Sequence, residues 1–478
     1  MSEHDSTLRV TIVGAGLGGL MLGVLLEKIG IEYDIFERSN SLKPYGAGMS
    51  LGANILPVFE QLELFDELRK ISYPGTGMDI FKEDMTRISR MNIGGHLDSI
   101  GYNTQFFSRP QVHNLLLSRI PPERVHYGKK VLSVGQSQHG TIVRFADGTT
   151  HESDIVIGAD GAYSAVRQSL YERLQKERLL PKSDTESLEV GYTCLVGTTV
   201  PLDPEKYPVL KDDFAHFSVV IADQKPYSWT IISVPGNRIC YGISIQLTAE
   251  QKETAFRNSE WRPESIDATI APFAHHLTPF GGTMGDLIEA TPRDLISNVY
   301  LEEKLFETWN HGRIALIGDA CHKMLPSAGQ GAINAMQDAV VVANCIYELG
   351  SSTSQEDIEA ALQDYKDQRF VHAKEQVRNS NVSGRLLYGQ TWFSKLVRTV
   401  IMYFLPKEFQ KSTLTSSAAY RPQVAFLPPA PKRGTLDIIP QKPSKRFQEE
   451  QQKLKVQKKE EEEEEEEAGQ NERAAHIV

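Results

Sequence analysis

One acid and one helix start in the last third of the chain could together bind an anionic ring system. Asp319 follows a short apolar run, and a proline, two glycines and a long helical pattern beginning near Gly329 come after it. A carboxylate can accept hydrogen bonds from sugar or ribityl hydroxyls, and a helix N-terminus carries partial positive charge that stabilises an anion. The combination suits a reduced flavin, and an ordinary strand, loop and helix is the alternative.

A second candidate site lies near the N-terminus, where glycines separate an apolar run from a helical pattern. Gly14, Gly16 and Gly19 form a GxGxxG turn, and Glu37 ends the next short apolar run. This is the dinucleotide fingerprint in its required context of strand, glycine turn, helix, strand and acid. Gly14 permits the tight turn, Gly16 lets the backbone approach a pyrophosphate, and Gly19 lets the helix pack close to the sheet. Glu37 can accept both ribose hydroxyls and would repel a 2′-phosphate, so the site suits FAD or NAD better than NADP.

A third motif, at 158–167, follows a buried-strand pattern and contains Asp160, Ser164 and Arg167. Taken alone, it is compatible with a plain turn followed by a helix that Asp160 or Ser164 caps. Arg167 could hold that helix through a salt bridge. The motif therefore has to be interpreted beside the other two.

Taken together, the three motifs resemble those of the single-component FAD-dependent monooxygenases, the aromatic-hydroxylase-like flavoproteins. The motifs are GxGxxG with Glu37, DGxxSxVR at 160–167 and GDxxHxxxPxxGxGxNxxxxDA at 318–339. The chain resembles in particular the fungal branch that modifies polyketides, terpenoids and alkaloids, over residues 8–405. The resemblance implies an α/β fold in which a Rossmann-like FAD-binding domain is interleaved with a substrate domain built on a mixed or antiparallel sheet, with a helical C-terminal region.

The resemblance also implies roles for residues in two of the motifs. Asp319 would hold the ribityl chain, and the backbone amides of Gly331 and Ala332 would face the pyrimidine end of the flavin ring. Asp160 would reach the pyrophosphate region through water or backbone, in a motif that the family uses for both FAD and the nicotinamide donor.

Two further cofactor contacts are expected outside the motifs. Arg109 begins a predicted helix where the family commonly has an arginine that contacts FAD, and a guanidinium suits phosphate. A surface arginine near a helix cap is the alternative. Gly48 lies in a GAGMSLGAN segment that matches the family loop beside the FAD, although glycine there also suits an ordinary turn.

Tyr192 is the candidate catalytic residue. It lies in the first strand of the predicted substrate sheet, in a segment similar to one that carries candidate catalytic residues in fungal relatives. A buried tyrosine with a satisfied hydroxyl is the alternative. Some relatives carry an arginine near this place, whereas this chain has none between Arg178 and Arg238.

The polar residues in the motif at 318–339 are expected to have structural roles. His322 could act as a catalytic base, but a histidine in this motif of the family usually has a structural role. Cys321 and His322 lack further ligands at metal spacing, so we expect no metal site. Asn334 and Asp338 are expected to serve packing and capping.

The chain divides into segments that differ in residue pattern and composition. Four strand patterns, at 192–200, 217–221, 228–234 and 238–245, predict a sheet that lines the substrate cavity. A Pro-rich segment and the acidic run 460–467 predict a disordered tail, with a charged helix from Arg446 as the alternative. The predicted segments are 8–185 for the first part of the FAD-binding domain, 186–290 for the substrate sheet, 291–405 for the return to the FAD-binding domain and the C-terminal helices, and 406–478 for the tail.

Composition narrows the partners and the compartment. The net charge of −11 argues against nucleic acid, and four widely spaced cysteines without a CxxC indicate reduced thiols in a cytoplasmic setting. The apolar segment 396–405 is about half of the length that a bilayer span needs, so a packed helix is favoured over peripheral membrane association.

These observations predict an FAD-dependent monooxygenase. It would use NAD(P)H as a transient co-substrate and O2 to hydroxylate or epoxidise a small, fairly apolar metabolite through a flavin C4a-hydroperoxide. A non-oxygenating flavin oxidoreductase, such as an oxidase, dehydrogenase or halogenase, is the alternative. The choice between NADH and NADPH stays open, because Glu37 concerns only the FAD site.

Overall fold

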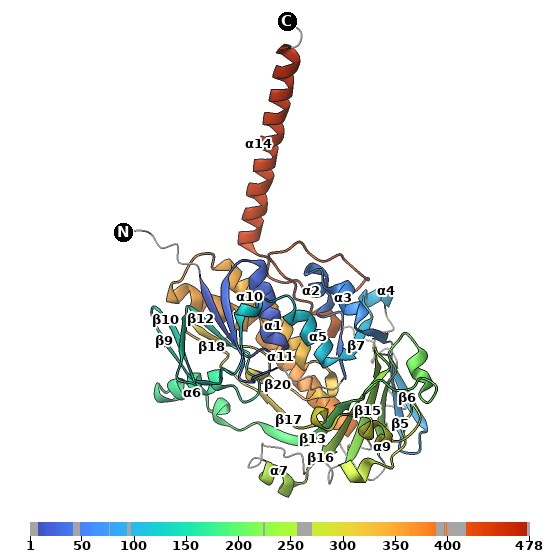
Figure 1. Ribbon diagram of the computed structural model, residues 1–478. Coiled ribbons are helices and arrows are strands. Elements are labelled where there is room, and N and C mark those ends of the chain that lie inside the picture. Colours follow the sequence, from blue (N-terminus) through green and yellow to red (C-terminus); the bar gives the residue numbers. More distant parts are fainter. Residues whose placement is uncertain are drawn as a thin grey trace.

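The computed structural model describes residues 8–41, 48–75, 77–92, 97–222, 225–255, 270–388, 396, 398 and 417–475. Two large sheets and the helices around them make up the body of the protein, and one long helix projects from it (Figure 1). The fold is α/β, as the sequence predicts.

The first large sheet is the Rossmann-like sheet. Its order is β18-β19-β12-β1-β2-β8, and β1 pairs in parallel with both β2 and β12. Val, Ile and Phe side chains of these strands are buried, which is typical of a parallel sheet covered on both faces. The strands are β1 (Arg9–Val13), β2 (Glu32–Phe36), β8 (Val125–His126), β12 (Ile155–Gly158), β18 (Asn310–His311) and β19 (Ile314–Leu316).

Three long helices pack on and beside this sheet. The helix α1 (Leu17–Lys28) packs against α10 (Gly331–Glu348), and α10 packs in turn against α11 (Gln355–Tyr388). A Cβ added to Gly18 would lie 3.1 Å from the carbonyl oxygen of Ala335, so glycine allows the close approach of α1 to α10. This contact brings the GxGxxG motif and the motif at 318–339 together.

The second large sheet has eight strands in the order β20-β17-β13-β16-β15-β14-β5-β6. The four strands that the sequence predicts are present as β13 to β16 and are antiparallel neighbours. The sheet is larger than the predicted segment 186–290, because β5 and β6 come from before it and β17 and β20 from after it. Its strands are β5 (Gly77–Lys82), β6 (Arg87–Asn92), β13 (Glu189–Thr198), β14 (Phe217–Ile221), β15 (Tyr227–Val234), β16 (Arg238–Gln246), β17 (Ser297–Leu305) and β20 (His322–Lys323).

The two faces of this sheet have different neighbours. Leu195 and Trp229 belong to a core that includes Leu287 of α9 (Met284–Glu289). Tyr192 belongs to a separate apolar cluster that includes Leu325, which lies just before η7 (Pro326–Ala328), and Leu387 at the end of α11. The Tyr192 face therefore lies toward the FAD-binding half.

Shorter elements connect these layers. An Asp147-Gly148 turn joins β10 to β11, with Gly148 at a φ of +82°. The remaining strands are β3 (Gly48–Leu51), β4 (Tyr73–Gly75), β7 (Thr104–Ser108), β9 (Val131–Ser137), β10 (Gly140–Phe145) and β11 (Thr150–Ser153). The remaining helices are α2 (Leu56–Gln61), α3 (Phe65–Lys70), α4 (Leu97–Ile100), α5 (Arg109–Leu117), α6 (Ala165–Lys176) and α7 (Ala249–Ala255).

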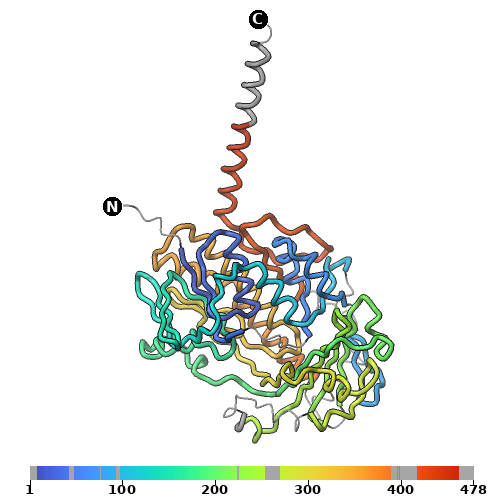
Figure 2. Tube along the Cα trace, in the orientation of Figure 1, coloured from blue at the N-terminus to red at the C-terminus, as the bar shows by residue number. Residues whose placement is uncertain are grey.

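The tail differs from the predicted disorder. Residues 417–444, which we call the C-terminal strap, pass along the body beside α2 (Figure 2), where Val424 N donates to Gln61 Oε1 at 2.9 Å. The strap leads into α14 (Lys445–Ala475), which is the charged helix that the sequence left as the alternative. Ser444 Oγ accepts the backbone N–H of Phe447 at 3.0 Å and so caps this helix, and the Glu, Lys and Gln residues that follow favour helix.

Within the described residues, no helix combines the length and apolar character needed to cross a bilayer. The apolar segment 396–405 falls outside these residues except for Leu396 and Arg398.

Candidate functional site

The glycine turn after β1 is built around three close approaches. Gly14 has a φ of +106°, and a Cβ there would lie 2.5 Å from the carbonyl oxygen of Ala159. A Cβ on Gly19 would lie 2.0 Å from the carbonyl oxygen of Gly14, so both positions require glycine. At Gly16, by contrast, a Cβ would meet no described atom within 4 Å. The open space beside Gly16 is where a pyrophosphate could approach the backbone.

Glu37 closes one side of this turn. Its carboxylate accepts the backbone N–H of Ala15 at 3.0 Å and that of Ser39 at 2.9 Å. His113 Nε2 lies 2.8 Å from the carbonyl oxygen of Ala15, and burial lowers the pKa of this histidine. A neutral His113 donates to that carbonyl, so the turn is held from two sides and the Glu37 carboxylate is fixed beside it.

Asp160 lies directly across from the glycine turn, as the contact of Gly14 with Ala159 requires. Its Oδ2 accepts the backbone N–H groups of Ala165 at 2.7 Å and Val166 at 3.3 Å at the start of α6. Its Oδ1 is buried and has no hydrogen-bond partner among the described atoms. Burial raises the pKa of Asp160, so this oxygen would gain from a donor that a ligand or water supplies.

Arg167 joins the motif at 158–167 to the motif at 318–339. Its guanidinium donates to the carbonyl oxygens of Ala320 at 2.8 Å and Ala162 at 2.6 Å, and it lies 4.2 Å from the ring centroid of Phe306. The expected salt bridge is therefore replaced by hydrogen bonds to backbone carbonyls. Ser164 accepts the Arg167 N–H at 2.9 Å, which confirms the cap that the sequence offered as an alternative.

Asp319 lies in η6 (Gly318–Ala320), at the end of β19. Lys323 Nζ donates to its Oδ2 at 2.6 Å. Burial alone would lower the pKa of Lys323, but the Asp319 carboxylate raises it, so Lys323 is charged. Lys323 was not among the residues expected in the site, although its spacing of four residues from an acid was a signal that could have identified it.

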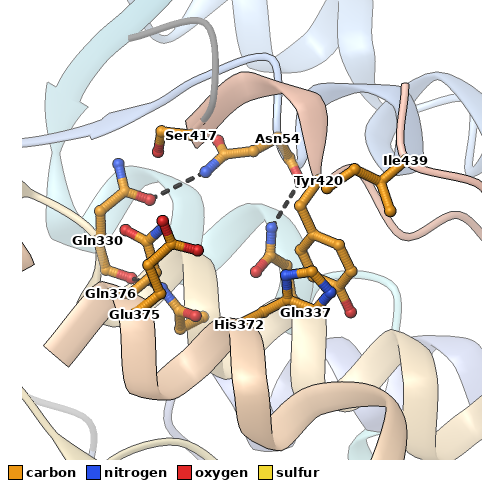
Figure 3. Close-up of a pocket in the computed structure, with 10 residues that line it drawn as sticks. Asn54, Gln330, Gln337, His372, Glu375, Gln376, Ser417, Tyr420 and Ile439 are labelled. Carbon is orange, nitrogen blue, oxygen red and sulfur yellow. Dashed lines mark hydrogen bonds between the residues drawn. The ribbon is translucent and has the colours of Figure 1, made fainter. Parts of the chain in front are cut away.

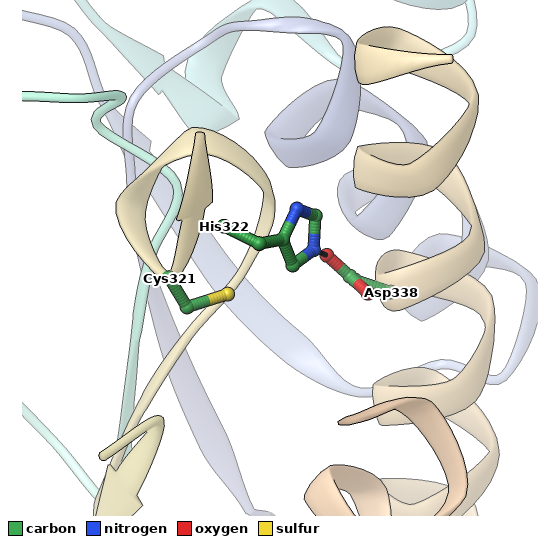
Figure 4. A group of neighbouring side chains, drawn as sticks. All are labelled: Cys321, His322 and Asp338. Atoms are coloured by element: carbon green, nitrogen blue, oxygen red, sulfur yellow. Dashed lines mark hydrogen bonds and ion pairs between the residues drawn. The ribbon is translucent and has the colours of Figure 1, made fainter. Parts of the chain in front are cut away.

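A fully buried ion network holds this loop on α10. Asp338 Oδ2 accepts the Gly318 N–H at 2.8 Å and lies 2.6 Å from His322 Nε2, and Arg369 Nε donates to Oδ1 at 2.7 Å. Burial would raise the pKa of Asp338, but His322 and Arg369 lower it. His322 and Asp338 point toward each other, with Cys321 beside them (Figure 4). The histidine is thus structural, as expected.

The ligand atoms of Cys321, His322 and Asp338 lie within 4.8 Å of one another, so Asp338 is a third potential ligand that spacing along the sequence did not show. The Cys321 Sγ lies 3.4 Å from the carbonyl oxygen of Leu316 and 3.5 Å from that of Gly318, which it can reach as a donor. Burial raises the pKa of Cys321 well above the ordinary value for a thiol. A neutral thiol beside the cationic Arg369 is a poor environment for a metal ion.

Gly331 and Ala332 begin α10 directly after a tight turn. The turn is η7, and Gly329 follows it with a φ of +63°. Both residues are only partly buried, and α10 has 18 residues, so its first amides and its dipole are directed at the space in front of the helix.

Arg109 occupies the first position of α5, after a capping box formed by Ser108 and Gln111. It is exposed, and its positive charge acts on both His113 and Lys323. Arg109 therefore lies between the Glu37 side and the Asp319 side of the site, and it makes no ion pair within the described chain.

Gly48 has a packing role that the sequence analysis did not predict. A Cβ there would lie 3.0 Å from both Cys240 Cβ and Ile232 Cδ1, so glycine lets β3 approach β15 and β16. The neighbouring Gly46 and Ala47 lie outside the described residues.

Tyr192 lies on β13 and is 8% exposed. Its ring meets that of Tyr388 edge-on, with centroids 5.6 Å apart, and burial raises the pKa of its hydroxyl. Among the described residues the Tyr192 hydroxyl has no hydrogen-bond partner. The alternative to a catalytic role, a buried tyrosine with a hydrogen-bonded hydroxyl, would require one. The apolar side chains that pack around it are Met78, Ile80, Cys194, Val219, Ile221 and Leu301, and Ser244 lies opposite Cys194 on the same face.

Comparison with known proteins agrees with this geometry. A family model described as an FAD binding domain matches residues 7–380. The FAD-dependent monooxygenase cle3 of Aspergillus versicolor is 30% identical over 447 residues, which cover 89% of this chain and 86% of the relative. The chain belongs to the FAD-dependent monooxygenase family. A second member, the FAD-dependent monooxygenase paxM of Penicillium paxilli, is 28% identical and covers 77% of this chain and 76% of its own.

Solved structures share the fold of this monooxygenase. Klebsiella pneumoniae HpxO, complexed with FAD and uric acid, has a TM-score of 0.68 and 20% identity, and covers 87% of this chain and 97% of its own. The 2,6-dihydroxypyridine-3-hydroxylase of Arthrobacter nicotinovorans has a TM-score of 0.63 and 22% identity, and covers 81% of this chain and 94% of its own. The cofactor of the family is FAD. The open space at Gly16 and the unpartnered oxygen of Asp160 fit that group.

Proposed function

We propose that this monooxygenase uses NAD(P)H and O2 to hydroxylate or epoxidise a small, fairly apolar metabolite. The balanced reaction converts substrate, O2, NAD(P)H and one proton into the oxygenated product, NAD(P)+ and water. When bound, FAD would accept a hydride and activate O2, which is chemistry that no side chain supplies. The protein then has to bind and orient the cofactor and the substrate, and it has to exclude water from the site.

Four residues of the Rossmann-like half would hold the adenosine and pyrophosphate end of FAD. Gly14, Gly16 and Gly19 shape a turn that the backbone of a dinucleotide can approach, and the fixed Glu37 carboxylate would accept the ribose hydroxyls. These four residues lie close together around one turn, which supports a common role in binding the dinucleotide.

The other cofactor contacts would come from the opposite side. Asp160 and Arg109 would face the pyrophosphate, where a guanidinium can pair with phosphate oxygens. Asp319 would accept ribityl hydroxyls, and the amides of Gly331 and Ala332 would stabilise negative charge at the pyrimidine end. Gly48 would contact the ring through its backbone while its missing side chain accommodates Cys240.

The observation that carries this proposal is that the sheet face with Tyr192 buries a cluster of apolar side chains toward the FAD-binding half, with Ser244 as a polar neighbour opposite Cys194. Tyr192 is on that face, and the residues around it in the cluster are aliphatic or carry sulfur, apart from Tyr388. An apolar surface favours an apolar substrate, and it excludes the water that would discharge activated oxygen. Tyr192 would orient the substrate through its hydroxyl.

Oxygen-isotope labelling tests this proposal. The holoenzyme would be incubated with NADPH or NADH, 18O2 and a panel of apolar terpenoid, polyketide and alkaloid compounds. We expect substrate-stimulated oxidation of the nicotinamide and one 18O atom in the product. An oxidised product without 18O would favour the non-oxygenating oxidoreductase, and a panel that never stimulates oxidation of either nicotinamide would count against both.

A further inference from the structure

A small polar cavity lies beside the first turns of α10 (Figure 3). Its volume is about 60 Å³, and three separate parts of the chain line it: the loop before α2, the helices α10 and α11, and the C-terminal strap. The lining residues are Asn54, Gln330, Asn334, Gln337, His372, Glu375, Gln376, Ser417, Tyr420 and Ile439.

The size and polarity of the cavity decide what it can hold. A water molecule occupies about 30 Å³ in the liquid, so this space suits about two waters and no ring-sized ligand. Asn54 Nδ2 donates to Gln330 Oε1 at 2.9 Å, and Gln337 Nε2 donates to the Asn54 carbonyl at 2.9 Å. The remaining amide and carboxylate groups in the lining, on Gln376 and Glu375, can bind water.

A wider groove of about 300 Å³ lies next to this cavity. The two spaces share His372, Tyr420 and Ile439, which we call the neck. The rings of His372 and Tyr420 stack at the neck, with centroids 3.6 Å apart and an interplanar angle of 17°. Beyond the neck, Asp367 and Lys442 line the outer groove.

The strap side of the neck is fixed by bonds from residues that follow Tyr420. Arg421 Nη2 donates to the carbonyl oxygen of Ile100 at 2.7 Å, and Ala425 N donates to Asn344 Oδ1 at 2.9 Å. Lys442 pairs with Asp364 at 2.7 Å. The C-terminal strap, which forms one side of the cavity, is therefore bonded to α10 and α11, which form the other side. The fold itself thus holds the cavity in place.

The neck carries no positive charge of its own at neutral pH. Burial, and then the positive charge of Arg369, lower the pKa of His372 to about 4. The ionisable groups around this imidazole are Arg369 and Glu375 of α11 and Tyr420 of the strap. A neutral imidazole can accept a hydrogen bond at one nitrogen and donate at the other, so it can link water on both sides.

We propose that the outer groove, the neck and the cavity form a water path that carries protons from solvent to the N-terminal turn of α10. The inner end of the path is Gln330, which precedes Gly331 and Ala332. This inference rests on the proposed function, whose net reaction takes up one proton for each oxygen atom inserted. The proton moves between water molecules and the side chains that bind them, and no electron moves with it.

The first test is crystallographic and needs no flavin. A high-resolution structure of the wild-type protein is expected to show about two ordered waters in the cavity, bound to the amide and carboxylate groups of its lining. H372F replaces the polar ring of the neck by an apolar one, and I439W fills the neck from the strap side if the first variant fails to fold. V382F is the matched control, because it adds a ring on the same helix at a position that is 57% exposed and lines neither space.

The second test measures proton delivery directly. Anaerobic, chemically reduced holoenzyme would be jumped from pH 8 to pH 6, and the absorbance change of the reduced flavin on protonation would be followed. We expect at least a tenfold slower change in H372F or I439W than in wild type, and an unchanged rate in V382F. A dry wild-type cavity, or a neck variant that protonates at the wild-type rate, would overturn the water path. A protein that takes up no FAD would instead reject the proposed function, and the crystallographic test would still decide whether the path holds water.

Discussion

The charge of Asp338 is predicted to be the main support of the loop that carries Asp319. Asp338 and Arg369 are both fully buried, and the carboxylate accepts from Gly318, His322 and Arg369 over 2.6–2.8 Å. D338N keeps the size of the side chain but leaves the guanidinium without its counter-charge. Breaking a buried pair in this way costs about 3–5 kcal/mol, a large part of the roughly 5–15 kcal/mol by which a domain is stable.

The assay is urea unfolding followed by circular dichroism, with D364N as the matched control. Asp364 also pairs with a cation, Lys442, but the two side chains are 34% and 57% exposed, so its loss should cost no more than about 1 kcal/mol. We expect D338N to lower the free energy of unfolding by several times as much as D364N. Equal losses in the two variants would refute the reasoning, because they would show that Asp338 is not the counter-charge of a buried cation.

Four further predictions concern the cofactor, the substrate face and pH. E37Q is expected to weaken FAD binding by at least tenfold in a titration followed by flavin fluorescence, since a ribose hydroxyl bond to a charged group is worth about 1.5–3 kcal/mol. K323M frees the partly exposed Asp319 from its partner at 2.6 Å and should weaken FAD binding by only about fivefold, which corresponds to about 1 kcal/mol. Y192F should keep the flavin spectrum and FAD affinity of wild type while it raises KM or lowers kcat, and an unchanged pair of constants would remove Tyr192 from the site. Because the pKa of His372 is about 4 when folded and 6.5 ordinarily, the unfolded chain binds the extra proton, so stability falls as the pH drops from about 6.5 to 4, and H372F should show a smaller fall in urea midpoint over that window.

The sequence predicted the parts of the fold that depend on local patterns. The glycine turn, its flanking strands and the strands β13 to β16 follow from alternation, β-branched residues and turn residues close along the chain. The membership of β5 in the same sheet did not follow, because β14 pairs with it in parallel across a long stretch of sequence. Partner choice at that range depends on tertiary packing, which no local pattern records.

In the candidate site, too, local patterns predicted some residues and long-range contacts determine the others. Gly14 and Gly19 could be predicted because a fixed backbone turn demands glycine there, whereas the roles of Lys323 and Gly48 depend on neighbours from distant segments. A salt bridge was one possibility for Arg167, yet it binds the carbonyl oxygen of Ala162 in its own motif and that of Ala320 beside Asp319. The tail was misjudged for another reason: low hydrophobicity argues against a packed core, but it does not prevent a capped helix of Glu, Lys and Gln.

The central claim is that the three motifs together hold one FAD, and binding stoichiometry tests it most directly. Purified protein stripped of flavin would be titrated with FAD by calorimetry, alongside E37Q and a variant of the facing motif, D319N. The account predicts one FAD per chain for wild type, with an oxidised-flavin absorption spectrum, and weaker binding in both variants. A wild-type protein that binds no FAD, or variants from both motifs that bind it as tightly as wild type, would contradict the account.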